Sequence, residues 1–288
     1  MLKSMYVKIT MPSLLYFDIP HLRRKGLFMG LWTLTHLYQI IPSFLIFAVL
    51  SVIAAKYYSK FDKSARYIPL QAIAVALLFL EIMKQINVAR DGSYDLYALP
   101  FHYCSLFLFL LPIHAFYRGK YSHITDTAAF ACLTSLVLDM LLMPAVIYSD
   151  SNIINYFNSF GDFHTVTFHN LVVLYFMLTV ALRLYEFNTK RDLKVMAIFF
   201  GVYVAIASIM SYTLKTNFHN LYRCNIAFLE EVRVAVVDAI GIFGTILYVC
   251  VMFVLTILFS YAAYALARLV IKIIDKLKAC MTKGKTAA

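Results

Sequence analysis

Charged residues are scarce in this chain. Only 14% of its 288 residues are Asp, Glu, Lys or Arg, whereas 62% are hydrophobic. A soluble domain carries roughly a quarter of its residues as charges, because its surface faces water. The shortage of charge excludes a soluble globular protein and, with a mean hydropathy of +0.76, indicates a chain that lies in a membrane.

Cysteine and glycine are also few, and neither forms a recognisable motif. The five cysteines, at positions 104, 132, 224, 250 and 280, include no CxxC pair, which excludes a disulfide scaffold and the common zinc motifs. HExxH and HxH spacings are missing too, so we predict no metal from motifs. The nine glycines form no phosphate-binding loop, so we expect no nucleotide cofactor.

Acidic residues are fewer than basic residues: the chain has 15 Asp and Glu and 26 Lys and Arg. The basic residues lie in short connections and in the C-terminal tail, a distribution that suits anionic lipid headgroups. No RNA-binding motif accompanies them, so we expect a lipid surface, and no nucleic acid, as the partner. Residues 1–36 lack the small-residue cleavage site that ends a secretory signal peptide.

Apolar runs are what the chain has in abundance, and several are about 18–22 residues long, enough to cross a hydrocarbon core of about 30 Å. In lipid each segment must satisfy its own backbone hydrogen bonds, so these runs predict an all-α, polytopic membrane helical bundle. We expect one domain over residues 33–268, between an N-terminal interfacial arm (1–32) and a basic cytoplasmic tail (269–288). The domain has about seven predicted transmembrane helices: 33–55, 69–86, 99–117, 127–148, 165–183, 195–214 and 236–268.

Seven spans place alternate connections on the two faces of the membrane. One face holds 16 of the 26 Lys and Arg residues and the other holds 9, with Lys84 inside a span. Because cytoplasmic loops are enriched in Lys and Arg, we predict a cytoplasmic C-terminus and an N-terminus outside. We therefore expect a multi-pass protein of the cell membrane.

Polar and ionisable residues gather at the outer end of these spans. Ionisable groups at membrane depth are costly, so they are candidates for function. A polar chamber that opens toward the outer face is the simplest account of the clustering. The supporting or substrate-binding candidates are Glu81, Lys84, Gln85, His102, Asn170, Asn217, His219 and Asp238. The residues that a metal would use share this face, although no motif spacing supports one: His102, Cys104, His164, His169 and His219.

The stretch LPFHYC, residues 99–104, sits where the third span should begin. If the helix starts at Pro100, the dipole and free N–H groups of its first turn favour a thiolate at Cys104. Residues two apart on a helix point about 200° away from each other, so His102 would be a poor base for this thiol. His169 lies at the same predicted depth in the fifth span, and we predict that it is the base.

LPFHYC resembles the L-P-x-H-x-C signature of the YwaF-like integral membrane proteins. Their eukaryotic relatives are the acyltransferases typified by transmembrane protein 164. The similarity runs over about residues 70–235 and includes further matches at Glu81, His169, Asn217 and Phe218. In that family a cysteine with a histidine partner is the proposed carrier of a fatty acyl chain that moves between phospholipid and lysophospholipid. Carried over to this chain, the resemblance assigns those roles to Cys104 and His169.

We therefore predict a membrane-embedded acyltransferase or lipid hydrolase. It would act on phospholipid acyl esters through a Cys104 thioester and a His169 base, with phospholipids or lysophospholipids as partners. The expected supporting groups are amides for the oxyanion, Gln85, Asn170 or Asn217, and carboxylates that orient a histidine, Glu81 or Asp238.

A small-molecule transporter, or a ligand-binding receptor that uses the same polar chamber, is the alternative. Transporters often show inverted repeats and broken helices, and neither is evident in this sequence. Covalent labelling of one cysteine distinguishes the two classes, because a binder accumulates no acyl group.

Overall fold

The structure, a computed structural model, describes residues 32–90, 94–148, 151, 153–224 and 227–286. The predicted interfacial arm lies outside the described residues except for Trp32. Among the described residues, six helices are long and apolar enough to cross a membrane. The predicted all-α, multi-pass architecture is confirmed, with six such helices where the sequence predicted about seven.

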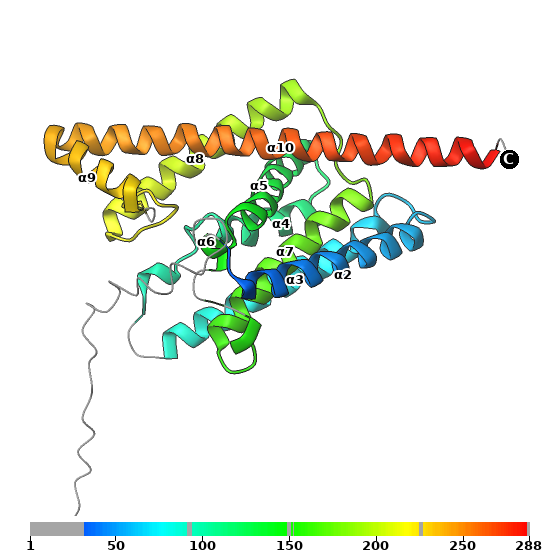
Figure 1. The fold of residues 1–288 in the computed structure, drawn as a ribbon, viewed down its shortest axis with the longest axis horizontal. Coiled ribbons are helices and arrows are strands. Elements are labelled where there is room, and N and C mark those ends of the chain that lie inside the picture. Colours follow the sequence, from blue (N-terminus) through cyan, green and yellow to red (C-terminus); the bar gives the residue numbers. More distant parts are fainter. Residues whose placement is uncertain (1–31, 91–93, 149–150, 152, 225–226, 287–288) are drawn as a thin grey trace, which may run out of the picture.

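The long helices are arranged as a bundle around α5 (Figure 1). They are, in chain order, α2 (Leu34–Tyr58), α3 (Ile68–Arg90), α5 (Ser122–Leu142), α7 (Phe160–Ala181), α8 (Thr189–Leu214) and α10 (Ile242–Thr286). The shorter elements are α4 (Phe107–Phe116), α6 (Pro144–Tyr148), α9 (Ala227–Ile240) and the 3-10 turns η1 (Ala65–Tyr67), η2 (Leu96–Ala98), η3 (Cys104–Leu106) and η4 (Ile153–Asn155).

Helix α5 is central because it packs against α4, α7, α8 and α10. Every residue from 127 to 136, TAAFACLTSL, is buried. The small side chains of this run let neighbouring backbones approach closely, which is how helices associate where water provides no hydrophobic drive.

The third predicted span differs most from its prediction. Instead of one helix over 99–117, the helical segment runs from Cys104 to Phe116, as η3 followed by α4. At 1.5 Å per residue it is about 20 Å long, which is short of the roughly 30 Å hydrocarbon core. A turn over residues 99–103 precedes this segment.

The last predicted span, 236–268, is divided between two helices. Gly241 has φ +57°, a left-handed conformation that ends α9 and reverses the chain into α10. A Cβ at Gly244 would lie 2.7 Å from the Val236 carbonyl oxygen, so glycine permits close contact between α9 and α10. The physical reason for the difference is this glycine turn inside an otherwise continuous apolar run.

Helix α10 continues without a break from Ile242 to Thr286 and extends beyond the bundle at its C-terminal end (Figure 1). The predicted basic tail at 269–288 is therefore, over its described part, a continuation of this helix. The division of the chain into arm, bundle and tail, and its orientation across the membrane, stay predictions.

The bundle has two ends, which we name the Cys104 end and the His114 end after residues at the start of η3 and in the last turn of α4. Helices α8 and α10 run antiparallel between them. At the His114 end, Arg268 of α10 donates to the hydroxyl of Thr189, the first residue of α8. The start of α10 and the loop that follows α8 meet at the Cys104 end.

Candidate active site

Cys104 is the first residue of η3, which continues directly into α4. The residues before it, 99–103, form turns, so the prediction that the helix starts at Pro100 is wrong. Leu99 has ψ 146°, the extended conformation that a following proline favours, and the chain turns before it becomes helical. His102 consequently lies ahead of the helix, and the argument that His102 and Cys104 occupy opposite helix faces does not apply.

The turn lies beside the second half of α3. Gln85 Nε2 donates to the Ala98 carbonyl at 2.9 Å, and Gln71 Nε2 donates to the Ala115 carbonyl at 3.2 Å, so α3 and α4 run antiparallel. Gln85 is five residues from the end of α3 at Arg90, or about 8 Å along the axis. Non-helical backbone at this depth is tolerated only where it is buried in protein or lines a polar cavity.

Several carbonyl groups of this turn accept hydrogen bonds, from α8 and from the turn itself. Tyr203 Oη donates to the Phe101 carbonyl at 3.3 Å, and the Ser105 N–H donates to the His102 carbonyl at 3.0 Å. His102 Nε2 lies 2.9 Å from the Tyr97 carbonyl. Since a carbonyl only accepts, Nε2 carries a proton, and Nδ1 holds the lone pair of the neutral ring. Burial lowers the pKa of His102, which keeps the ring neutral near pH 7.

A buried polar cluster lies beside this turn, where α3 packs against α7. Lys84 Nζ is 2.8 Å from Glu81 Oε1, and Glu81 Oε2 is 3.8 Å from His164 Nε2. Gln85 Nε2 donates to Glu81 Oε1 at 2.6 Å. The side chains of Glu81, Lys84 and His164 are only 13%, 23% and 11% exposed. We refer to Glu81, Lys84, Gln85 and His164 as the α3–α7 cluster.

The Cys104 thiol is half-buried and lies within electrostatic range of Lys84 and Glu81. Burial raises the pKa of the Cys104 thiol and Glu81 adds to this rise, whereas the Lys84 ammonium and the amino end of a helix favour the thiolate. Two of the predicted supporting residues therefore lie near enough to the predicted nucleophile to influence its charge.

His169 lies further along α7 than His164. Its Nδ1 is 2.8 Å from the Thr165 carbonyl, and its ring contacts that of Tyr148 at 5.7 Å. Nδ1 must donate to that carbonyl, so Nε2 holds the lone pair that a general base needs. The two histidines are within electrostatic range of each other, and the Phe168 ring contacts both. His164 is the one that contacts the α3–α7 cluster, and the pairing of His169 with Cys104 stays a prediction.

The remaining predicted side chains have varied placements. Gln85 uses both amide hydrogens, one on the α3–α7 cluster and one on a carbonyl of η2. Asn170 Oδ1 accepts from Tyr148 Oη at 3.4 Å. Asn217 Oδ1 accepts two backbone N–H bonds within its own loop, at 3.1 and 3.3 Å. Asp238 is exposed on α9.

His219 connects the loop after α8 to α10. Its Nε2 is 2.9 Å from Thr256 Oγ1, and its ring stacks on Tyr103 at 5.5 Å. The Thr256 hydroxyl donates to the Met252 carbonyl at 2.8 Å, so it accepts from a protonated Nε2. Burial, with a smaller effect of His102, lowers the pKa of His219 to about 4. The ring is therefore neutral near pH 7, and its hydrogen bond to Thr256 connects this loop to α10.

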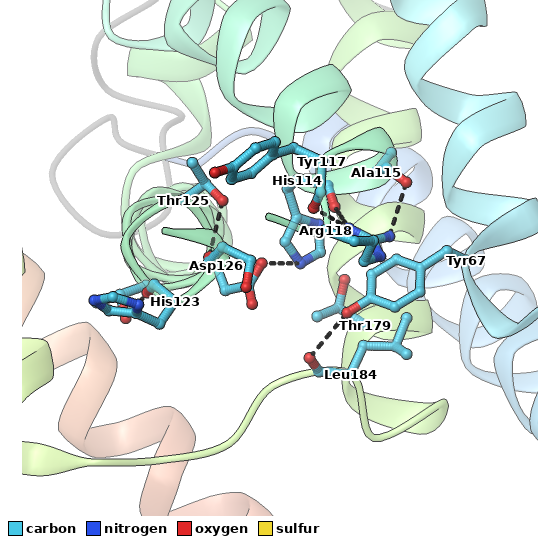
Figure 2. Close-up of polar contacts among 12 residues, drawn as sticks. Tyr67, His114, Ala115, Tyr117, Arg118, His123, Thr125, Asp126, Thr179 and Leu184 are labelled. Carbon is cyan, nitrogen blue, oxygen red and sulfur yellow. Dashed lines mark hydrogen bonds and ion pairs between the residues drawn. The ribbon is translucent and has the colours of Figure 1, made fainter. Parts of the chain in front are cut away.

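A second buried polar cluster lies at the His114 end (Figure 2). His114 Nε2 is 3.7 Å from Asp126 Oδ1. Arg118 donates to three carbonyls at the end of α4, at 2.6–2.8 Å, and its guanidinium lies 3.3 Å from the centre of the Tyr67 ring. His114 follows Cys104 by ten residues, or about 15 Å along the helix. This histidine and carboxylate therefore stabilise the end of α4 and are too far away to serve the thiol.

The residue that sequence reasoning missed is His164 as the partner of Glu81. Both residues lie in mainly apolar segments, and their pairing depends on the rotation of α3 against α7, which spacing along the chain does not reveal. Within the described parts of the chain, no three His, Cys, Asp or Glu side chains gather closely enough to hold a metal ion. The five residues considered for a metal therefore do not converge.

Comparison with known protein families gives a match. The model of the TMEM164 family matches residues 31–263, which is more than half of the chain and includes both polar clusters. No curated protein and no solved structure matches significantly. The YwaF-like signature stays a resemblance.

Proposed function

The chain belongs to the TMEM164 family, and from this we propose that it is a membrane-embedded acyltransferase or lipid hydrolase that acts on phospholipid acyl esters. The observation that carries the proposal is the position of Cys104, half-buried at a helix start with Lys84 and Glu81 in electrostatic range. A membrane cysteine is ordinarily a small hydrophobic side chain, as Cys132 is in the packed interior of α5.

In the proposed first half-reaction, the Cys104 thiolate attacks the carbonyl carbon of a phospholipid ester. The ester C–O bond breaks, and the lysophospholipid oxygen leaves with a proton from the histidine that accepted the thiol proton. The acyl group remains on sulfur as a thioester. In the second half-reaction, the histidine takes a proton from an acceptor hydroxyl, and that oxygen attacks the thioester carbonyl. The C–S bond breaks, which returns the thiol; with water as the acceptor, a fatty acid is released.

His169 is the base that we propose, because its Nε2 holds a lone pair. Lys84 joins Asn170 as a proposed donor to the tetrahedral oxyanion, a role worth roughly 3 kcal/mol per donor in known enzymes. Gln85 is less suited to this role, since both of its amide hydrogens already have acceptors. Glu81, 2.8 Å from Lys84 Nζ, would hold this ammonium in position.

The direct test is acyl transfer by the full chain in proteoliposomes. A phosphatidylcholine with a deuterated acyl chain serves as donor and a lysophosphatidylethanolamine as acceptor. Mass spectrometry of the lipids should show deuterated phosphatidylethanolamine for a transferase and deuterated fatty acid for a hydrolase. Cys104→Ser should abolish both products, because a hydroxyl is protonated at neutral pH. Cys250→Ser, a matched change on the exposed surface of α10, should leave them unchanged. A folded Cys104→Ser protein with undiminished product contradicts the proposal.

A further inference from the structure

A polar pocket of about 240 Å³ lies beside the Cys104 turn. It is lined by Tyr97, Lys215, Thr216, Asn217, Tyr222 and Arg223. Every one of these side chains carries a hydrogen-bonding group, and two of them are cations. A concave site with these properties, in a chain that is otherwise mainly apolar, is suited to an anionic group.

The two cations of this pocket are available to a ligand. In the part of the chain that the structure describes, neither Lys215 nor Arg223 takes part in an ion pair. Glu230 is within electrostatic range of Arg223, but its carboxylate already accepts from another arginine at 2.6 and 2.7 Å and from a backbone N–H at 2.7 Å. The other carboxylate nearby, Asp95, accepts from the backbone N–H of Tyr97 at 2.9 Å, and one carboxylate does not offset two cations. The pocket therefore keeps a net positive charge.

The loop that forms most of the pocket is held in an unusual conformation. Lys215, His219 and Asn220 have φ values of 52°, 50° and 57°, which are uncommon for residues other than glycine. Asn217 Oδ1 accepts from the backbone N–H of Arg223 at 3.1 Å and so fixes the start of that side chain. Backbone in sparsely populated conformations persists where surrounding contacts over-determine it, and such positions cluster at ligand sites.

Contacts of Tyr97 and Phe218 with His102 connect the pocket to the Cys104 turn. The Tyr97 side chain lies within electrostatic range of both Cys104 and Arg223. The Tyr97 carbonyl accepts from His102 Nε2, and the buried Phe218 ring of the pocket loop contacts the His102 ring at 5.0 Å. In a glycerophospholipid, only the glycerol unit separates the phosphate from an acyl ester. A lipid whose phosphate binds in this pocket would therefore keep its acyl ester near the pocket.

We propose that this pocket binds the phosphate of a glycerophospholipid headgroup through the Lys215 ammonium and the Arg223 guanidinium, with the Thr216 hydroxyl as a further donor. Guanidinium and ammonium groups form strong charge-assisted hydrogen bonds with phosphate oxygens, and a polar cavity excludes an acyl chain. The inference rests on the proposed function for the identity of the lipid and adds the location of its headgroup. It predicts that lipids without a phosphate, such as monoacylglycerols, bind weakly.

The test is binding of matched lipids to the full-length protein in detergent, followed by native mass spectrometry. The probes are 1-palmitoyl lysophosphatidylethanolamine and 1-palmitoylglycerol, which share an acyl chain and differ in the phosphate headgroup. The wild type should bind the phosphate-bearing lipid at least about ten-fold more tightly, as expected for charge-assisted bonds. The double variant Lys215→Gln/Arg223→Gln should lose that preference and keep its affinity for 1-palmitoylglycerol. Lys190→Gln/Lys194→Gln, an equal loss of exposed charge at the His114 end, should bind like the wild type.

Equal binding of the two lipids by the wild type, or an equal loss in both double variants, overturns the proposal. Competition by glycerol 3-phosphate distinguishes a lipid phosphate from a free one. If glycerol 3-phosphate displaces the lipid fully when both are at the same concentration, the lipid assignment is overturned. Weak displacement supports the assignment. Cys104→Ser should bind both lipids like the wild type, so a failure of the thioester chemistry and a failure of the pocket give different results. If the double variant does not fold, Lys215→Gln alone, a change to an exposed side chain, should show a smaller loss of the same preference.

Discussion

The choice of base depends on two histidines that lie five residues apart on α7. His164 faces the Glu81 carboxylate at 3.8 Å, whereas His169 has its Nδ1 fixed by the Thr165 carbonyl. A histidine that shares a carboxylate with Lys84 helps to hold this cation in place. A histidine with a free Nε2 lone pair is suited to proton transfer. The two therefore have different expected roles, although they lie on one helix.

Substitution of each histidine separates these roles. His169→Ala should reduce acyl transfer by about 10² to 10⁴, the range for loss of a general base. His164→Gln keeps a hydrogen-bonding group beside Glu81 and should reduce transfer far less. Steady-state kinetics as a function of pH provides the measurement, because only loss of the base removes a titration from the rate profile. The reverse pattern would assign the base to His164.

His219 makes folding stability depend on pH. Its pKa is about 4 in the folded protein against 6.5 ordinarily, because the ring is buried. Between these values the unfolded chain binds more protons than the folded chain, so the free energy of unfolding decreases as the pH drops from 6.5 toward 4. Above pH 6.5 the neutral ring makes its full contribution to stability. His219→Asn removes this titration, and Asn tolerates the left-handed backbone at this position. The wild type should lose about 2 kcal/mol more than the variant between neutral pH and about pH 5.

Thermal unfolding in detergent, at both pH values, measures this difference. His102 lies nearby with a lowered pKa and is present in both proteins, so the effect of its own burial is common to them. An identical pH dependence in the wild type and in His219→Asn would show that the ring does not titrate with folding.

Contacts within one helix follow from spacing along the chain. Glu81 and Lys84 are three residues apart on α3, a spacing at which opposite charges are neighbours, and they lie 2.8 Å apart. The contact of Glu81 with His164 joins two helices, and no local rule gives the rotation that brings them together. Asn217 looked like an oxyanion donor, yet its carbonyl oxygen organises a loop whose conformation the sequence does not reveal.

At the level of elements, the short η3–α4 segment shows why an apolar run is an ambiguous signal. LPFHYCSLFLFLLP has the composition of a membrane helix from its first residue, but its first five residues form a turn. Apolar composition predicts burial, and burial in protein permits a turn as well as a helix. The proline was the informative residue, because Leu99 before it is extended.

The α9–α10 reversal gives a test of close helix packing. A Cβ at Gly244 would lie 2.7 Å from the Val236 carbonyl oxygen and 2.8 Å from the Val237 Cα. Gly244→Ala should therefore destabilise the protein by about 1–3 kcal/mol, the usual cost of overpacking. Gly161→Ala in α7 is the matched control, since its nearest contact is 3.7 Å away. We expect this control to be neutral or slightly stabilising, because alanine favours helices.

Thermal unfolding of both glycine variants in lipid nanodiscs measures the difference. A Gly244→Ala protein as stable as Gly161→Ala would mean that α9 and α10 can separate without cost. In that case the Glu230 contact with the backbone of the loop after α8 would not depend on this reversal.

For the whole molecule, the predicted orientation decides on which side of the membrane the candidate active site lies. Most Lys and Arg residues were assigned to one face from the sequence, and Arg118, Arg268 and Lys272 lie at or near the His114 end. The positive-inside rule then places the His114 end in the cytoplasm and the Cys104 end outside.

Accessibility in intact cells tests this orientation. A C-terminal tag should be protected from added protease, and a reporter inserted between residues 150 and 160 should be accessible. Permeabilised cells, in which both sites are cut, provide the control. A tag that is cut while the loop is protected would invert the orientation and place the Cys104 end in the cytoplasm.

The membrane architecture was predictable because composition and run length follow directly from the thickness of the bilayer. The number of full spans was not predictable from composition. The segment Cys104–Phe116 is apolar like its neighbours and differs from them in its helical length. The placement of Cys104 within electrostatic range of Lys84 and Glu81 depends on the packing of separate helices, so the sequence indicated the end of the bundle but not the contacts within it.

The central claim is that Cys104 carries an acyl group, and mass spectrometry of the protein itself tests it most directly. Full-length protein is mixed with a phosphatidylcholine that has one deuterated acyl chain, in the absence of acceptor, then quenched in acid and digested. We predict a deuterated acyl mass on the peptide that contains Cys104, its loss on treatment with neutral hydroxylamine, and its absence from Cys104→Ser. An acyl mass on another cysteine, or acyl transfer without any acylated Cys104, would contradict the account.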